Sequence, residues 1–244
     1  MASVPIRSVT VLPAVREDVA FRTEDGLTLV GELALPAGPP VATLITLHPL
    51  PTGGGFMDSH LFRKAAWRLP YLADVAVLRF NSRGTRSPRG ASEGNFDGGV
   101  GEGADVRAAV EFSVSRGLEN RWLVGWSFGS DLALMHGHSL GVEGAFLLSP
   151  TLSRARMGDL EAWAETGRPV TVLVPEHDEY LPPVEARVGF APLPGAEILV
   201  GEGASHLWVG EERVRWVLDR IVERVAPARA PLPVEVPGEV VGKG

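Results

Sequence analysis

The alternation of short apolar runs with longer segments of helical spacing constrains the fold of this chain more than any other feature of its sequence. Eight runs are rich in β-branched residues and are bounded by turn residues, which is typical of strands. The expected strands are 18–23, 27–35, 41–47, 75–80, 121–125, 142–149, 170–174 and 197–200. From the third strand onward, segments with helical spacing lie between them, at 59–72, 103–116, 128–140, 156–165, 183–190 and 207–225.

Strands that alternate with helices are joined by right-handed crossovers and form a mostly parallel sheet. The first two runs are separated only by Glu24, Asp25 and Gly26, which predicts a hairpin and an antiparallel edge. The sequence therefore predicts an α/β fold in which a mostly parallel eight-stranded sheet carries helices on both faces.

Residues 1–226 are expected to form a single domain, because α/β folds often reach about 200 to 250 residues before they divide. The interval between the strands ending at 149 and beginning at 170 is too short to hold a second domain. Residues 81–102 lack periodicity, which predicts a long loop at the edge of the sheet or of a cleft. Residues 227–244 contain four prolines and end in Gly-Lys-Gly, which predicts a disordered tail.

Charge and composition exclude several classes of function. The 30 acidic and 23 basic side chains leave a net charge of −7, and the arginines are scattered, so no nucleic-acid partner is expected. The chain has no cysteine, which excludes thiol nucleophiles, thiolate metal ligands and disulfides. Neither a signal peptide nor an apolar run long enough to span a bilayer is visible. We therefore expect a cytoplasmic protein with no membrane partner.

The pentapeptide 125–129, Gly-Trp-Ser-Phe-Gly, places Ser127 between a predicted strand and a predicted helix. A strand-to-helix turn this sharp strains its central residue and brings neighbouring backbone close, so glycines are needed on both sides. Such a turn exposes the serine hydroxyl above the sheet as a candidate nucleophile. The alternative is a glycine-rich turn whose serine only caps the helix.

A serine nucleophile needs an imidazole to take its proton and a carboxylate to orient that imidazole. Asp178 follows one predicted strand and His206 follows the next, at the sheet edge where functional groups gather. The order Ser127, Asp178, His206 is the order Ser, acid, His of one hydrolase architecture. Glu176 and Glu179 are alternatives for the acid.

These residues resemble the α/β-hydrolases, and the resemblance extends from residue 18 to residue 225. It is strongest to small, lid-free serine hydrolases that carry His-Pro after the third strand and Arg-Phe-Asn-x-Arg-Gly after the fourth. Here these motifs are 48–49 and 79–84. The serine at 127 differs from the cysteine nucleophile of the dienelactone hydrolases and from the aspartate nucleophile of the dehalogenases in the same family.

The resemblance implies that Ser127 is the nucleophile, His206 the general base and Asp178 the orienting acid. It also implies an oxyanion hole built from the backbone N–H of Phe128 and a second N–H from the loop after the third strand, for which we expect Leu50. Pro49 stands where lipases and esterases usually have glycine, which leaves other second donors open. By sequence neighbourhood, the pocket walls are expected to include Leu50, Phe56, Met57, Trp126, Tyr180 and Trp208, with core packing as the alternative for each.

Other motifs predict no site. The glycine-rich stretch 98–103 does not directly follow a strand, as a dinucleotide-binding loop must. His136 and His138 are two apart on a predicted helix and cannot bind one metal ion from one face, so neither a metal nor a cofactor is expected. Arg83, Arg86 and Arg89 could bind an anionic substrate group, but solvated loop positions are the preferred interpretation.

The leading hypothesis is a serine hydrolase that cleaves a small carboxylic ester or thioester through an acyl-enzyme. One alternative is a non-catalytic binding or interaction protein on a hydrolase fold, because fold alone does not determine function. Another is an acyltransferase or peptidase that uses the same three residues. The sequence does not identify the substrate, and it leaves homo-oligomer formation open.

Overall fold

A computed structural model describes residues 2–243 and contains one central sheet of eight strands. The strands are β3 (Val15–Arg22), β4 (Thr28–Leu35), β5 (Ala42–Leu47), β6 (Val75–Phe80), β9 (Arg121–Trp126), β10 (Gly144–Leu148), β11 (Val170–His177) and β12 (Ala196–Ser205). Their order in the sheet is β12-β11-β10-β9-β5-β6-β4-β3. Strands β5, β6 and β9 to β12 are parallel, whereas β4 runs antiparallel to both β6 and β3. The predicted mostly parallel sheet and its hairpin at the edge are confirmed.

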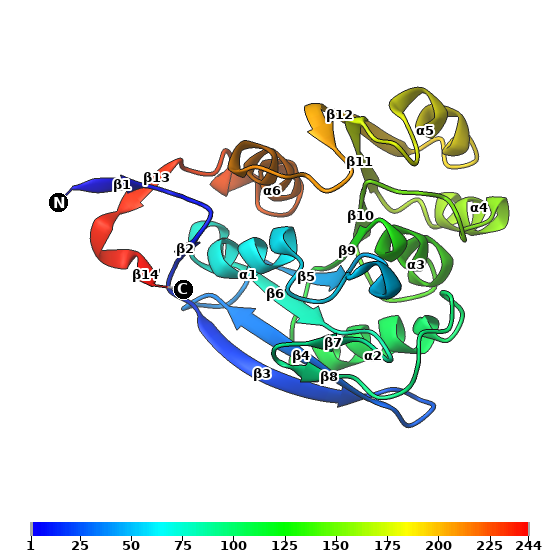
Figure 1. The fold of residues 1–244 in the computed structure, drawn as a ribbon, viewed down its shortest axis with the longest axis horizontal. Helices are drawn as coiled ribbons and strands as arrows, with labels where there is room; N and C mark the ends of the chain where they lie inside the picture. The colour runs from blue at the N-terminus through cyan, green and yellow to red at the C-terminus, as the bar shows by residue number, and fades with distance from the viewer. Residues whose placement is uncertain (1, 244) are drawn as a thin grey trace.

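Six helices pack on the two faces of this sheet (Figure 1). They are α1 (His60–Ala73), α2 (Glu102–Ser115), α3 (Phe128–Gly137), α4 (Met157–Thr166), α5 (Pro183–Gly189) and α6 (Glu211–Val225). Helices α2 to α5 share one buried apolar cluster with the sheet, and α1 and α6 share another on the opposite face. The two clusters take alternate residues of the same strands, as in β5, where Leu44 belongs to one and Ile45 to the other.

The loop from 81 to 102 is mostly irregular, as predicted, and contains only a short hairpin of β7 (Arg86–Ser87) and β8 (Gly90–Ala91). No helix within residues 2–243 has both the length and the apolar character that a bilayer span requires. Strands β11 and β12 extend further than predicted, so that they end directly before Asp178 and His206.

The expectation of a disordered tail from residue 227 is corrected for residues 227–243. A short strand, β13 (Glu235–Pro237), pairs antiparallel with β1 (Ser3–Pro5), and β14 (Gly242–Lys243) pairs with β2 (Thr10–Val11). The N-terminal and C-terminal segments therefore lie side by side in Figure 1. The physical reason is burial: Leu232 and Val236 are 4% and 3% exposed, and Leu232 joins the cluster under α1 and α6. Prolines in the tail obscured this apolar spacing in the sequence.

Candidate active site

Ser127 lies in a sharp turn between β9 and α3, with φ 54° and ψ −115°. This backbone conformation is unfavourable for a residue with a side chain and is held only by close packing around it. An added Cβ at Gly125 would overlap the carbonyl oxygen of Gly129, and one at Gly129 would overlap that of Leu47. The prediction that backbone approaches both flanking glycines is confirmed. The turn places the Ser127 hydroxyl at the N-terminus of α3.

Three side chains from three strand ends form a continuous hydrogen-bonded chain. The Oγ of Ser127 lies 2.9 Å from Nε2 of His206, and Nδ1 of His206 lies 2.9 Å from Oδ2 of Asp178. The carboxylate can only accept, so Nδ1 carries the proton and Nε2 accepts from the serine hydroxyl. Asp178 and His206 are 4% and 6% exposed. The imidazole is therefore oriented to take a proton from Ser127.

The turn after β11 distinguishes Asp178 from the two neighbouring carboxylates. Oδ1 of Asp178 accepts hydrogen bonds from the N–H groups of Tyr180 and Leu181, at 2.9 and 3.2 Å. Glu176 and Glu179 are exposed, and Glu176 accepts a 2.6 Å hydrogen bond from the N–H of Gly203. Of these three carboxylates, only Asp178 contacts His206. Glu176 instead links β11 to β12 through Gly203.

The backbone around His206 is held by Ser149 and His60, which the sequence analysis did not single out, and by Trp126, which it assigned to the pocket wall. The carbonyl oxygen of His206 accepts hydrogen bonds from Oγ of Ser149 at 2.8 Å and from Nε1 of Trp126 at 3.2 Å. The next carbonyl, that of Leu207, accepts from Nε2 of His60 at 2.7 Å. Burial lowers the pKa of His60. Ser149 directly follows β10. Its position as a polar residue at the end of a strand is the sequence signal that could have identified it.

Among the described residues, no hydrogen-bond acceptor is found for the backbone N–H of Leu50 or of Phe128, the two donors expected for the oxyanion hole. Phe128 is the first residue of α3, where free N–H groups and the helix dipole favour a negative charge. The loop that carries Leu50 packs against the turn of Ser127, because the Leu47 and His48 carbonyls approach Gly129. The N–H of Phe128 is therefore free at this turn, and the loop of Leu50 lies beside it.

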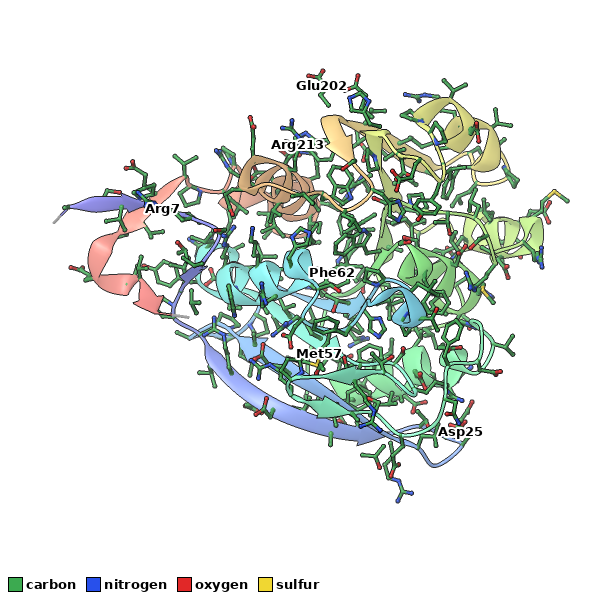
Figure 2. All side chains as sticks on the ribbon, in the orientation of Figure 1. Arg7, Asp25, Met57, Phe62, Glu202 and Arg213 are labelled. Carbon is green, nitrogen blue, oxygen red and sulfur yellow. The ribbon has the colours of Figure 1, made fainter. Side chains whose placement is uncertain are left out.

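The residues expected to form pocket walls divide into two groups. Tyr180 is 61% exposed and its ring lies 4.4 Å from that of His206, and Leu50 and Phe56 are half-buried. Met57, Trp126 and Trp208 are at most 2% exposed, so their assignment to a surface pocket is corrected to core packing. Met57, labelled in Figure 2, is fully buried. Sequence neighbourhood failed here because it does not determine the direction of a side chain.

Two cavities of the molecule lie away from Ser127. A cavity of about 310 Å³ lies between α1, α6 and the C-terminal segment, and one of about 260 Å³ adjoins Trp208 and Trp216. Neither is lined by Ser127, Asp178 or His206. Across residues 2–243, no three His, Asp or Glu side chains are grouped as a metal site requires.

The loop arginines have partners of their own. Arg83 is 7% exposed and pairs with Asp105 at 2.9 Å and with Asp25 at 3.0 Å, so its expected solvation is corrected to a buried ion pair. Arg89 pairs with Asp18 and Glu32 at 2.7 and 2.6 Å. Arg86 is exposed. Arg83 and Arg89 hold the loop 81–102 against α2 and the β3–β4 hairpin, so they are not free to bind an anionic substrate group.

Comparison with known proteins agrees with this architecture. No protein-family model matches the sequence. An uncharacterized protein of Rickettsia prowazekii is 31% identical over 106 residues, which cover 43% of this chain and 42% of that protein. The chain thus matches less than half of that relative's length.

Solved structures match almost the whole chain. A lid-free α/β serine hydrolase of Xanthomonas campestris superposes with a TM-score of 0.72 at 24% identity, covering 91% of this chain and 99% of that one. An α/β serine hydrolase homologue of Coxiella burnetii gives 0.70 at 26% identity, with 86% and 97% covered. An esterase of Pyrococcus furiosus gives 0.68 at 18% identity, with 86% and 90% covered. The chain therefore has the α/β-hydrolase fold, and over most of its length it is similar to a serine hydrolase that has no lid.

Proposed function

We propose that this protein is a serine hydrolase that cleaves small carboxylic esters or thioesters. The observation that carries the proposal is the 2.9 Å contact between Ser127 and His206, with Asp178 behind the imidazole at 2.9 Å. The Ser127 hydroxyl lies on a strained turn and makes no capping hydrogen bond to α3. A serine that only capped the helix would not need this strain. The esterase and serine hydrolases of similar fold support the same class of reaction.

In the first half of the reaction, Oγ of Ser127 attacks the carbonyl carbon as Nε2 of His206 takes the hydroxyl proton. The negative charge on the carbonyl oxygen is stabilised by the N–H groups of Phe128 and Leu50. The C–O or C–S bond then breaks, and His206 returns the proton to the leaving alcohol or thiol. Asp178 keeps Nδ1 protonated and stabilises the imidazolium while it exists.

In the second half, water attacks the acyl-enzyme and His206 removes its proton. The second tetrahedral intermediate collapses, the carboxylic acid leaves, and Ser127 regains its proton. No cofactor, metal, nucleic acid or membrane takes part in this scheme. The accessible site suits a small-molecule substrate, which approaches along the edge formed by Tyr180 and Leu207, 61% and 53% exposed.

The first experiment is labelling with a fluorophosphonate probe, followed by peptide mapping, because it tests nucleophile activation without knowledge of the substrate. We expect label on Ser127, and loss of label in Ser127→Ala and His206→Ala. Each variant should also lose at least about 10⁴-fold in kcat on p-nitrophenyl acetate. Ser139→Ala, which removes an exposed hydroxyl beyond the C-terminus of α3, is the matched control and should retain both.

Three outcomes would contradict the proposal or change it. A folded protein that takes no label favours a binding protein on this fold. Label on another serine would reject Ser127. Aminolysis or alcoholysis that outcompetes water would replace the hydrolase with an acyltransferase, and cleavage of amides in preference to esters would indicate a peptidase.

A further inference from the structure

The imidazole of His48 is buried where β5 enters the loop that carries Leu50, and it has no part in the reaction described above. It is 3% exposed. Its Nε2 lies 3.0 Å from the backbone N of Ser82 and 3.1 Å from the Ser82 hydroxyl. A backbone N–H can only donate, so Nε2 accepts and the ring proton is on Nδ1. Nδ1 lies 2.7 Å from the carbonyl oxygen of Pro49, and it therefore donates to that oxygen.

This hydrogen bond fixes the orientation of one peptide group. The Pro49–Leu50 bond is trans, so the carbonyl of Pro49 and the N–H of Leu50 point in opposite directions from the same rigid plane. The Pro49 carbonyl faces the loop interior, where it packs so closely on Gly55 that an added Cβ there would overlap it. The Leu50 N–H must then point out of the loop.

The far end of the same loop is held by the segment 79–84 that the sequence analysis singled out. Oδ1 of Asn81 accepts a 3.0 Å hydrogen bond from the N–H of Met57, and Nη1 of Arg79 donates to the Met57 carbonyl at 3.2 Å. Asn81 and Arg79 are both fully buried. Together with Ser82 they attach the loop to the end of β6, so the contact of His48 acts within a fixed frame.

We propose that His48 is a positioning residue for the oxyanion hole. Its Nδ1–H holds the Pro49 carbonyl and thereby directs the Leu50 N–H toward the substrate. The inference rests on the proposed function, since it concerns one donor of that site. The tautomer suits this role, because burial also lowers the pKa of His48 to about 4 and leaves the ring neutral at pH 7. If the ring were flipped, or if Nε2 carried a proton, Nε2 could no longer accept the hydrogen bond from the Ser82 N–H.

Two substitutions distinguish the roles of the two ring nitrogens of His48. The amide nitrogen of asparagine takes the place of Nδ1, so His48→Asn keeps the donor to Pro49 and loses the acceptor for Ser82. The amide of glutamine reaches the place of Nε2, so His48→Gln keeps the acceptor and loses the donor. We expect His48→Gln to lose about 100-fold in kcat on p-nitrophenyl acetate, with little change in KM, because an oxyanion donor acts in the transition state. His48→Asn should stay within about fivefold of the wild type.

The matched control is His136, whose Nε2 donates to the Gly99 carbonyl at 2.7 Å near the other end of α3. His136→Asn removes a similar imidazole–carbonyl bond and should leave kcat unchanged. A second readout is the affinity for a trifluoromethyl ketone, which forms a tetrahedral adduct with Ser127. It should weaken in His48→Gln by the same factor as kcat, whereas a purely structural loss would affect KM and unfolding instead.

Equal activity in the two variants, or wild-type kcat in a folded His48→Gln, would overturn the role of His48. If His48→Gln does not fold, ¹⁵N NMR of the wild type at pH 7 decides, since a proton on Nε2 instead of Nδ1 would equally overturn the proposal. Failure of the proposed function is a separate result, because it appears in the wild type as the absence of both fluorophosphonate label and turnover.

Discussion

The hydroxyl of Ser149 donates a 2.8 Å hydrogen bond to the main-chain carbonyl of His206, and both residues are buried. Nε1 of Trp126 donates to the same oxygen at 3.2 Å. The end of β10 and the end of β9 thus both fix the residue that carries the general base. His206 directly follows β12, which is separated from β9 by β11 and β10, so these bonds set its distance from Ser127.

Removal of this hydroxyl should loosen the base. We expect Ser149→Ala to lower kcat by about tenfold and the free energy of unfolding by about 1 to 2 kcal/mol, because a buried carbonyl loses one of its two donors. Ser113→Ala is the control, since Ser113 is also fully buried and its hydroxyl donates to the Val110 carbonyl on α2. Equal loss of stability in both variants with unchanged kcat in both would show that the Ser149 contact does not affect catalysis.

The turn of Ser127 should tolerate no methyl group at Gly129. Gly129→Ala would force the Cβ into the Leu47 carbonyl, so we expect at least about 3 kcal/mol of destabilisation and loss of fluorophosphonate labelling. Gly158→Ala, on α4, meets no atom within 4 Å and should stabilise by about 0.5 to 1 kcal/mol through helix propensity. Urea unfolding compares the two, and a stable, labelled Gly129→Ala would contradict the described packing.

Stability should fall in acid through His48. The unfolded chain protonates this ring near pH 6.5, whereas burial lowers its folded pKa to about 4. Between these values the unfolded state binds the extra proton, so the contribution is complete above pH 6.5 and is lost as the pH falls towards 4. Between pH 7 and 4.5 we expect about 2 to 3 kcal/mol from this group. Urea unfolding of His48→Asn should show a pH dependence smaller by that amount, and identical slopes would argue that His48 is not buried in the neutral form.

The C-terminal segment should contribute to folding but not to chemistry. Leu232 is 4% exposed, and its N–H donates to Oδ1 of Asp219 on α6 at 2.8 Å. Leu232→Ala should therefore cost about 2 to 3 kcal/mol without a change in kcat. Val234→Ala, at a side chain 52% exposed, is the control and should cost under about 0.5 kcal/mol. If both variants unfold like the wild type, residues 227–243 behave as the disordered tail that their prolines suggested.

The strands, the helices and the order of Ser127, Asp178 and His206 could be predicted because each depends on local pattern. Buried parallel strands are apolar throughout, and functional residues follow their carboxyl ends. The role of Ser149 could not be predicted, because it depends on how closely β10 approaches the end of β12. Trp126 was misplaced for a related reason: its neighbour Ser127 reaches the surface, but the strand turns Trp126 toward the core beneath α1 and α6.

The short connections around α4 have a consequence for the fate of an acyl group. Only residues 149–156 precede this helix after β10 and only 167–169 follow it before β11, so no segment there folds over Ser127. Enzymes that pass acyl groups to alcohols or amines protect the intermediate by excluding water. An acyl group on Ser127 would instead stand at a surface that bulk solvent reaches without any opening step. Under the proposed function, water would therefore hydrolyse this intermediate before another acceptor could take the acyl group.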